Sequence, residues 1–239
     1  MRRILTIVVT YNEATNIGRL IPEILKNLPT SSVLVVDDNS PDGTADVVRA
    51  LAASDPRVEI LSRMSERGYG SATIAGMQHA IRQGYDVIAT LDADFSHSPA
   101  DLPRLIEALS VADVAIGSRY VGGIRILNWG VQRLLLSLAA NSYIRFLSGL
   151  ACVDCTSGFR AYRVDALKKV PLGRISSTGY SFLPELLFAL NRVTVEEVPI
   201  CYTERRVGQS KMGLRVIAEA IVRPWALLCR RMVRALTDR

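Results

Sequence analysis

The chain has few residues that build imidazole metal sites, and it lacks the long apolar runs that cross membranes. It has two histidines, His79 and His97, and neither stands beside an obvious serine or cysteine nucleophile. A membrane-spanning helix needs about 20 apolar residues, and Arg145 interrupts the apolar stretch at 134–153. We therefore expect neither a histidine-based zinc site nor a transmembrane helix.

Cysteines are few as well. The chain has 4 in 239 residues, and a chain of this length can bury a core that needs no disulfide. We expect free thiols and a cytoplasmic protein. Cys152 and Cys155 have the spacing of a redox or zinc motif, but no second such pair follows. We interpret them as two ordinary buried thiols, with a functional pair as the alternative.

A glycine-rich dinucleotide motif is missing after the first apolar run. The only glycine pair nearby, Gly68 and Gly70, comes much later and precedes a helix, so a Rossmann dinucleotide site is disfavoured. The first residues, MRRILTIVVTYNE, are basic and then apolar like a signal peptide, but the apolar part is short and no small-residue cleavage site follows. We predict a first strand at this point.

The overall composition is that of a folded, basic protein. Hydrophobic residues make up 49% and charged residues 22% of the chain, which is ordinary globular usage. The 29 Lys and Arg residues exceed the 23 Asp and Glu residues, which gives a net charge of +6. This sign favours anionic partners such as phosphates, acidic lipid headgroups or nucleic acid.

Short apolar runs alternate with segments of helical periodicity in the first half of the chain. This alternation predicts βαβ units and a parallel sheet flanked by helices. Ser98 and Pro99 form a helix start signal. The predicted strands lie at 4–9, 33–36, 58–61, 87–91 and 114–116, and the helices around 17–28, 47–51, 74–81 and 102–109.

The pattern is less regular after Gly117. Pro224 predicts a break in the last helix. We find no linker or repeat, so we expect one domain over 1–239. The later predictions are a long apolar segment at 129–153, a strand at 159–162, a helix at 183–190, a strand at 193–200 and a helix from Leu214.

Two acidic pairs follow directly on predicted strands. Asp37 and Asp38 follow the run VLVV, and Asp92 and Asp94 follow VIATL. Ligands of open parallel sheets bind beyond the carboxyl ends of the strands. We therefore expect both pairs to line one crevice.

The triplet Asp92, Ala93 and Asp94 suits a hard divalent cation, because residues i and i+2 of an extended segment point the same way. Oxygen ligands select Mg²⁺ or Mn²⁺, and two carboxylates leave coordination positions for a nucleotide diphosphate. The alternative is a solvated turn, but placement after a buried strand favours the metal-bridged nucleotide site. Tyr11 and Glu13, after the first strand, should join the same crevice.

Several motifs resemble those of family 2 glycosyltransferases of the inverting, metal-dependent type. These motifs are TYNE at 10–13, VVDDNSPDGTADVV at 35–48, LDADFSHSP at 91–99 and IGSRYVGG at 116–123. Four further motifs resemble those of polyprenol-phosphate (dolichol-phosphate) mannosyl synthases. They are NWGVQR at 128–133, DCTSGFRAYR at 154–163, STGYSFLPELL at 177–187 and EVPICYTERRVGQSKMG at 197–213. The resemblance covers nearly the whole chain. It implies a GT-A-type α/β fold, with a parallel-rich twisted sheet flanked by helices and with C-terminal acceptor-binding helices.

The resemblance also implies a nucleotide-sugar half at 1–125 and an acceptor half at 126–239. The metal, Mg²⁺ or Mn²⁺, would be held by Asp92, Asp94 and Ser96, with Ser96 standing where some relatives supply glutamine. The implied nucleotide-sugar contacts are Tyr11, Glu13, Val36 (through its backbone), Asp38, Asp92, Ala93, Asp94, Arg205 and Lys211.

The implied acceptor site binds a phosphate. The resemblance places Arg119, Arg133 and Ser137 beside it. Arg205 and Lys211 would lie on a loop over the donor diphosphate and act with the two carboxylates of the DxD triplet in catalysis.

The implied reaction needs no general base. A lipid phosphate is already anionic near neutral pH, since its second pKa is about 6, so its oxygen can attack the sugar directly. Direct displacement inverts the anomeric centre. The resemblance therefore implies that GDP-mannose and a polyprenyl (dolichyl-type) phosphate give polyprenyl phosphate β-mannose.

Two apolar segments that carry arginines are typical of helices at an anionic lipid surface. They lie at 134–153 and 216–236, and the alternative is that they complete the core. We expect a peripheral protein at the cytoplasmic membrane face. Whether a separate membrane subunit anchors it is left open.

Other functions stay open at this point. The same chemistry with UDP-glucose, or a family 2 enzyme that acts on a polysaccharide, is the near alternative. A non-catalytic nucleotide-sugar-binding or membrane-recruiting module is more distant, because Asp92 and Asp94 are both present. We expect no nucleic-acid partner, because the basic residues fall in separate motifs.

Overall fold

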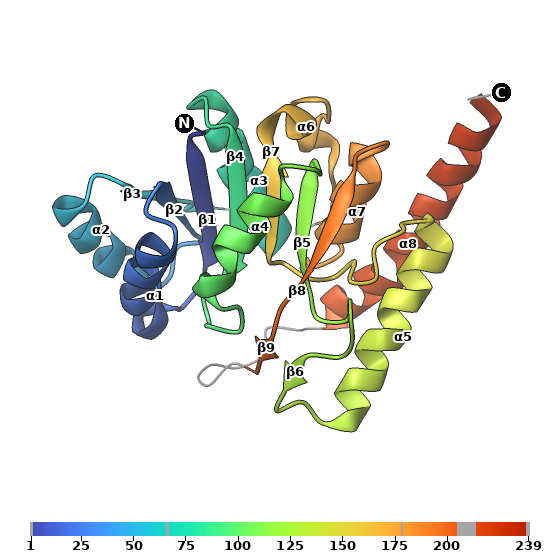
Figure 1. Ribbon diagram of the computed structural model, residues 1–239, viewed down its shortest axis with the longest axis horizontal. Coiled ribbons are helices and arrows are strands. Elements are labelled where there is room, and N and C mark those ends of the chain that lie inside the picture. Colours follow the sequence, from blue (N-terminus) through green and yellow to red (C-terminus); the bar gives the residue numbers. More distant parts are fainter. Residues whose placement is uncertain (1, 66, 178, 205–213, 238–239) are drawn as a thin grey trace.

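The computed structural model describes residues 2–65, 67–177, 179–204 and 214–237 (Figure 1). A seven-stranded sheet lies at its centre, in the order β3-β2-β1-β4-β7-β5-β8. The strands are β1 Ile4–Thr10, β2 Ser31–Asp37, β3 Val58–Ser62, β4 Val87–Asp92, β5 Val114–Ser118, β7 Arg160–Arg163 and β8 Val195–Pro199. All of the strands predicted from apolar runs are therefore confirmed, with ends that differ by a few residues.

One strand of this sheet runs against the others. β7 pairs antiparallel with both β4 and β5, while the remaining pairs are parallel. Strands from residues 1–125 and from 126–239 thus share one sheet. The observed architecture is the predicted α/β type with a parallel-rich sheet.

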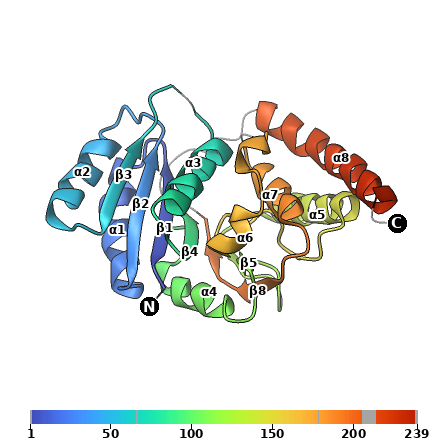
Figure 2. The same cartoon turned by 90° about the horizontal axis from the view of Figure 1, so that it is seen from above.

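Helices cover both faces of the sheet, and each face has its own apolar core. Along β1, Leu5 and Ile7 point into the core under α3, α6 and α7, whereas Ile4 and Val8 point into the core under α1, α2 and α4. This alternation follows from the two-residue period of a strand. Figure 2 shows the two helical layers. The helices are α1 Ala14–Asn27, α2 Thr44–Ser54, α3 Tyr69–Arg82, α4 Leu102–Ala108, α6 Val164–Lys168 and α7 Phe182–Leu190.

The predicted start signal of α4 is confirmed in a modified form. The Ser98 side chain accepts a hydrogen bond from the Ala100 N–H at 3.3 Å, and Pro99 follows it. The first turn is a short 3₁₀ segment, Pro99–Asp101, that leads directly into α4.

Two long helices, α5 (Val131–Ser148) and α8 (Leu214–Thr237), pack against each other at one end of the sheet (Figure 1). The predicted break at Pro224 is wrong, because α8 continues through it. A proline removes one backbone hydrogen bond, but the Tyr143 hydroxyl of α5 donates to the Ile221 carbonyl at 2.7 Å, and Arg223 donates to Ser176 at 2.8 Å. Both contacts hold the turn of α8 that directly precedes Pro224. None of the described helices is long and apolar enough to span a bilayer.

A second, small sheet was not predicted. It consists of two parallel two-residue strands, β6 (Ile126–Leu127) and β9 (Tyr202–Thr203). β6 and β9 lie beyond the end of the main sheet at which β5 and β8 finish (Figure 1). This small sheet brings the segment before α5 beside the segment that follows β8.

Candidate active site

The two acidic pairs meet at one edge of the sheet, as predicted. β1 lies between β2 and β4, and its Thr10 is in register with Asp37 while its Val9 is in register with Asp92. The three strands are parallel, so their carboxyl ends coincide. This edge, with the loops that follow it, forms the candidate donor site.

The Asp37 carboxylate is engaged in hydrogen bonds within the protein. Its carboxylate accepts hydrogen bonds from the Thr10 hydroxyl at 2.9 Å, the Ser40 N–H at 2.9 Å and the Ser40 hydroxyl at 2.5 Å. These bonds fix the turn that follows β2. Asp38, the next residue, lies just beyond the end of β2 and has different partners.

Asp38 lies in a basic environment that the sequence did not predict. Its carboxylate accepts a hydrogen bond from the Gly68 N–H at 2.8 Å and contacts Arg63 Nε at 3.3 Å. Burial raises the pKa of Asp38, and the Gly68 and Arg63 contacts oppose this shift. Arg63 follows β3 directly, so its position after a strand was the signal that could have identified it.

Tyr11 and Arg67 form a flat surface close to this carboxylate. The Arg67 guanidinium lies over the Tyr11 ring, 4.7 Å from its centroid. A stacked pair of this kind suits a nucleobase. Glu13 begins α1, where its N–H donates to the Thr44 hydroxyl at 2.9 Å and its carboxylate accepts from Asn16 at 2.9 Å.

Val36 and Ala93 lie in the interior. Val36 is fully buried in β2. Its side chain lies against α3 at Gly76, where the helix comes close to the strand. Ala93 is also buried, between the two carboxylates of the DxD triplet. Neither side chain extends into open space, so the ligand contacts predicted at these two positions would have to come from the backbone.

Asp92 and Asp94 follow β4 and supply hard oxygen donors. Asp94 accepts a hydrogen bond from the Ser96 N–H at 3.0 Å, which shapes the turn after the strand. Ser96 is buried, and its carbonyl accepts from the Thr203 N–H at 3.2 Å. Within the described residues, no group of three or more His, Cys, Asp and Glu side chains could hold a metal ion. Two carboxylates fit a divalent ion that takes its other ligands from diphosphate and water.

His97 is a site residue for which the sequence predicted no role. It is buried between the Phe159 ring, at 5.1 Å, and the Tyr202 ring, at 5.3 Å, and its Nδ1 lies 3.7 Å from Asp92 Oδ2. Burial lowers the pKa of His97 to about 4, so the ring is neutral near pH 7. It supports Asp92 by packing and forms no ion pair with it at that pH.

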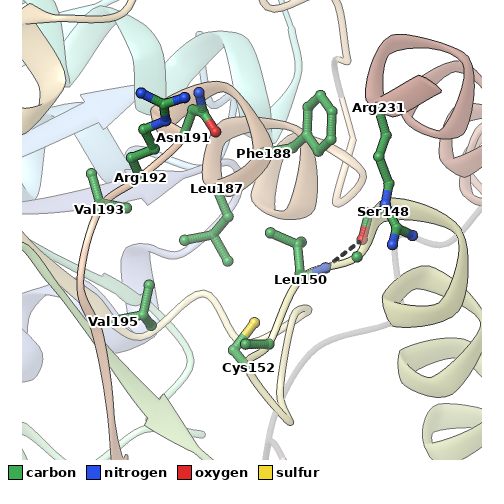
Figure 3. Close-up of a pocket in the computed structure, with 12 residues that line it drawn as sticks. Ser148, Leu150, Cys152, Leu187, Phe188, Asn191, Arg192, Val193, Val195 and Arg231 are labelled. Atoms are coloured by element: carbon green, nitrogen blue, oxygen red, sulfur yellow. Dashed lines mark hydrogen bonds between the residues drawn. The ribbon is translucent and has the colours of Figure 1, made fainter. Parts of the chain in front are cut away.

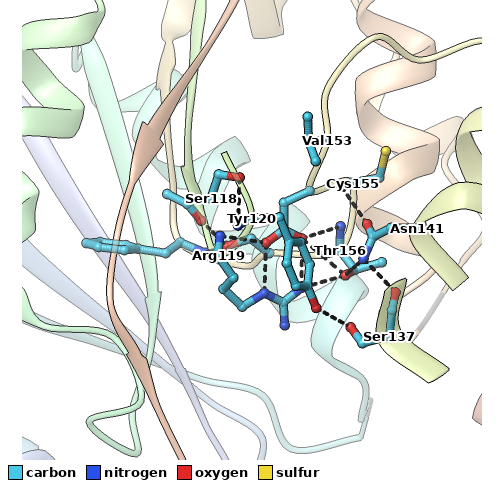
Figure 4. Close-up of polar contacts among 12 residues, drawn as sticks. Ser118, Arg119, Tyr120, Ser137, Asn141, Val153, Cys155 and Thr156 are labelled. Carbon is cyan, nitrogen blue, oxygen red and sulfur yellow. Dashed lines mark hydrogen bonds and ion pairs between the residues drawn. The ribbon is translucent and has the colours of Figure 1, made fainter. Parts of the chain in front are cut away.

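Arg119 belongs to a buried polar network (Figure 4). Its Nε and Nη2 donate to Asp154, both at 2.7 Å, and its Nη2 also donates to Thr156 at 2.7 Å. Nη1 is the guanidinium nitrogen that these bonds do not use. Burial alone would raise the pKa of Asp154, but the hydrogen bonds from Arg119 outweigh it and hold this pKa below its ordinary value.

The other two predicted acceptor residues lie on α5, close to this network. The Tyr120 hydroxyl donates to Ser137 at 2.7 Å (Figure 4). Arg133 forms an ion pair with Glu204, and its guanidinium lies 4.2 Å from the centroid of the Trp129 ring. The Arg119 guanidinium lies 5.8 Å from the same ring. The three residues predicted to bind the acceptor phosphate are thus gathered around one group of aromatic rings.

Aromatic contacts join the acidic and basic parts of the site. His97, beside Asp92, meets the edge of Tyr202, and Tyr202 meets Trp129 at 5.4 Å. The Arg119 guanidinium lies 5.6 Å from the Tyr202 ring. A nucleotide diphosphate at the carboxylates and an anion at the arginines would therefore be neighbours. Arg205 and Lys211 lie outside the described residues, so their predicted roles stay predictions.

Comparison with known proteins identifies the family. The model of glycosyl transferase family 2 matches residues 6–171. An undecaprenyl-phosphate mannosyltransferase of Micrococcus luteus is 44% identical over 95% of this chain and 96% of its own length. A polyprenol monophosphomannose synthase of Mycolicibacterium smegmatis is also 44% identical, over 95% of this chain and 88% of its own length. A dolichol-phosphate mannosyltransferase of Pyrococcus furiosus is 36% identical over 91% of this chain and 61% of its own length.

Solved structures support the fold. Glucosyl-3-phosphoglycerate synthase from Mycobacterium tuberculosis, in complex with Mn²⁺, UDP-glucose and phosphoglyceric acid, superposes with a TM-score of 0.68 at 19% identity. The match covers 96% of this chain and 79% of that chain. The same enzyme with Mg²⁺ and UDP gives a TM-score of 0.66 at 18% identity, over 94% of this chain and 80% of that chain. From the family match and the three relatives, the chain belongs to glycosyltransferase family 2.

Proposed function

We propose that the chain transfers mannose from GDP-mannose to a polyprenyl phosphate, with inversion at the anomeric carbon. The observation that carries this proposal is the junction of two charged sites through His97, Tyr202 and Trp129. One site offers carboxylates for a metal–diphosphate group, and the other offers arginines for an anionic acceptor. The 44% identity to two polyprenyl-phosphate mannosyltransferases supports mannose as the sugar.

On the donor side, the base stacks against the flat surface that Tyr11 and Arg67 form, and Asp38 accepts hydrogen bonds from the polar edge of the base. Asp92 and Asp94 would hold Mg²⁺ or Mn²⁺, with Ser96 as a weaker third ligand. A bound ion would supply positive charge that stabilises the leaving diphosphate. His97 keeps the Asp92 side chain in place by filling the space beside it.

On the acceptor side, Arg119 and Arg133 orient the lipid phosphate, and Ser137 adds a hydroxyl. Asp154 fixes the Arg119 guanidinium in advance, so little side-chain entropy is lost when the phosphate binds. When the phosphate binds, Arg133 gives up its ion pair with Glu204 and pairs with the phosphate instead. One phosphate oxygen then attacks the anomeric carbon from the side opposite the diphosphate, the bond from that carbon to the diphosphate oxygen breaks, and GDP leaves.

The prenyl chain and the membrane meet the exposed apolar side chains of α5 and α8. Those on α5 are Val131, Leu135, Leu136 and Phe146, and those on α8 are Ile221, Val222, Trp225, Met232 and Val233. Arg223, Arg230 and Arg231 stand among them, as is typical of contact with anionic lipid. We place this contact at the cytoplasmic membrane face, where the four free cysteines of the chain would stay reduced.

A donor panel tests the proposal. The purified chain is incubated with a short prenyl phosphate, Mg²⁺ or Mn²⁺, and either GDP-mannose or UDP-glucose, and the lipid product is identified by mass and by the configuration of its anomeric proton. We expect a β-mannosyl phosphate product from GDP-mannose only. A product from UDP-glucose alone would support the rival donor, and no lipid product from either donor would contradict polyprenyl-phosphate transfer.

A further inference from the structure

Cys152 and Cys155 lie next to each other in the segment that follows α5. Both side chains are buried thiols, and their sulfur atoms are 3.3 Å apart. A disulfide has an S–S distance of about 2.05 Å, so closing one here needs a relative movement of roughly 1 Å. The pair is thus close to bonding geometry without being bonded.

A pocket gives small molecules a route to one of the two sulfurs. It has a volume of about 440 Å³, and Cys152 lines it together with residues of α5, α7 and α8 (Figure 3). Leu150, Leu187 and Val195 form part of its apolar wall. Cys155 is fully buried. A reagent in the pocket therefore meets Cys152 first.

The surroundings of Cys152 favour its thiolate, which is the reactive form. The hydrogen bond from Cys155 lowers the pKa of Cys152, and the positive charge of Arg160 contributes to the same shift. Arg160 is fully buried, and its guanidinium donates to the carbonyls of Ser157, Leu183 and Cys155 at 2.7, 3.0 and 2.7 Å. The pair therefore consists of one activated thiol and one neighbouring thiol that can resolve its oxidised form.

The segment between the two cysteines carries the carboxylate that holds Arg119. The N–H groups of Val153 and Asp154 donate to Glu197 at 2.6 and 2.9 Å, and the Cys155 N–H donates to Asn141 of α5 at 2.8 Å. These bonds position Asp154 in the thiol state. Because Asp154 lies inside the Cys–x–x–Cys turn, a change in the turn moves the anchor of Arg119.

We propose that Cys152 and Cys155 are a peroxide-oxidisable dithiol whose closure to a disulfide displaces Asp154 and Arg119. The Cys152 thiolate attacks one oxygen of hydrogen peroxide, the O–O bond breaks, and hydroxide leaves and takes up a proton to become water. The Cys155 sulfur then attacks the resulting sulfenic sulfur, the S–O bond breaks, and the hydroxide that leaves takes up the Cys155 proton to become a second water. The two thiols lose two electrons, and the peroxide gains them.

The effect on transfer rests on the proposed function, whereas formation of the disulfide does not. If Arg119 orients the acceptor phosphate, oxidation weakens acceptor use. We expect donor binding to stay unchanged, because the turn between the two cysteines holds Arg119, which we assign to the acceptor side.

The test uses the full chain with the exposed Cys201 and Cys229 changed to Ser, so that only the buried pair remains. The folded protein is treated with hydrogen peroxide, and its free thiols are alkylated and identified by peptide mass. The same variant with Cys155→Ser is the matched control. Amide hydrogen exchange at Arg119 and Asp154 reports on the turn without any need for activity, and acceptor KM and GDP affinity are measured before and after oxidation.

We expect an intramolecular disulfide that dithiothreitol reverses, faster exchange of the Arg119 and Asp154 amides, and an acceptor KM that rises at least about fivefold with GDP affinity unchanged. The Cys155→Ser control should stop at the sulfenic acid. Two results would overturn the proposal: thiols that resist peroxide until the protein unfolds, or a disulfide that leaves both amides unchanged. A third result separates the two proposals. If the disulfide forms and the Arg119 and Asp154 amides exchange faster, but the reduced protein makes no mannosyl lipid, the proposed function is contradicted and the oxidisable dithiol is still supported.

Discussion

Asp154 joins a buried arginine to the loop that carries the cysteine pair. Its carboxylate is fully buried and accepts three hydrogen bonds from Arg119, at 3.0, 2.7 and 2.7 Å. A buried charge is costly unless it is paired. This pair therefore affects stability as well as the orientation of Arg119.

Asp154→Asn should lower the free energy of unfolding by about 3 kcal/mol at pH 7, because Arg119 would keep a buried charge without a counter-charge. The pKa of Asp154 is lower in the folded state than its ordinary value of 3.8. The stabilisation is therefore fully present above pH 3.8 and is lost as the pH falls through the folded-state pKa. Urea unfolding at a series of pH values measures this loss, which the variant should lack. Asp165→Asn, at an exposed carboxylate on α6, is the control, and equal acid sensitivity of wild type and Asp154→Asn would contradict the assignment.

Asp94→Asn should reduce transfer at least about a hundredfold while the fold stays intact. The substitution removes a negative charge from the metal ligands, but the asparagine oxygen can still accept the Ser96 N–H. Turnover is measured over a range of Mg²⁺ and Mn²⁺ concentrations, and thermal unfolding checks the fold. Asp46→Asn, at an exposed carboxylate of α2, should behave as wild type. Normal turnover by Asp94→Asn at limiting metal would remove this residue from the site.

The sequence predicted the carboxylates of the site better than their neighbours. Asp92 and Asp94 could be identified because they end an apolar run, and strand ends are where ligands bind. Arg63 and Arg67 were missed because their place in the site depends on contacts with Asp38 and Tyr11, which are distant in sequence. The internal use of Asp37 could not be predicted for the same reason, since Thr10 belongs to another strand.

At the scale of single elements, the first turn of α5 carries Arg133 into the site. Arg133→Ala should raise the acceptor KM about tenfold, the loss expected for one charge-assisted hydrogen bond, and leave GDP affinity unchanged. Steady-state kinetics and calorimetry with GDP separate the two effects. Arg49→Ala removes a comparable exposed ion pair on α2 and serves as control. If the variant lost GDP binding but kept a normal acceptor KM, Arg133 would be assigned to the donor site and the acceptor role would be contradicted.

Substitutions on the exposed face of α5 test the proposed membrane contact. Leu135 and Leu136 are 60% and 69% exposed. Changing both to Asp should weaken binding to vesicles of phosphatidylglycerol and phosphatidylcholine by at least about tenfold, since each buried leucine contributes about 2 kcal/mol. Val111→Asp places the same charge at a residue that is 74% exposed outside α5 and α8, and it should have no effect. Equal sedimentation of all three proteins with vesicles would contradict the proposed contact.

Elements with strong local periodicity were predicted well, and those that depend on partners were not. The strands and helices of the first half follow from apolar spacing alone. The two-residue strands β6 and β9 were missed because such short strands exist only through their pairing with each other. Pro224 misled the prediction of α8 because contacts from Tyr143 and Ser176 offset its local cost.

At the scale of the whole molecule, close packing of α3 on the start of α7 joins the two halves of the chain. A Cβ atom on Gly70 would lie 2.6 Å from the Ser177 carbonyl oxygen and 2.7 Å from Phe182 Cβ. Gly70→Ala should therefore cost about 1–3 kcal/mol of unfolding free energy. Gly173→Ala is the matched control, because a Cβ atom on Gly173 would have nothing within 4 Å among the described residues. Equal urea midpoints for both variants would show that the interface can relax.

The position of β7 has a consequence for how the protein is made. β7 spans residues 160–163, yet it lies between β4 and β5, which end at residues 92 and 118. While a ribosome is still synthesising the chain, β1 to β4 can assemble as a parallel unit, but β5 has no partner in the sheet until β7 emerges. During that interval β4 presents an open edge, and such edges pair readily with other chains. Nascent chains halted between residues 118 and 160 should therefore be the species that chaperones retain.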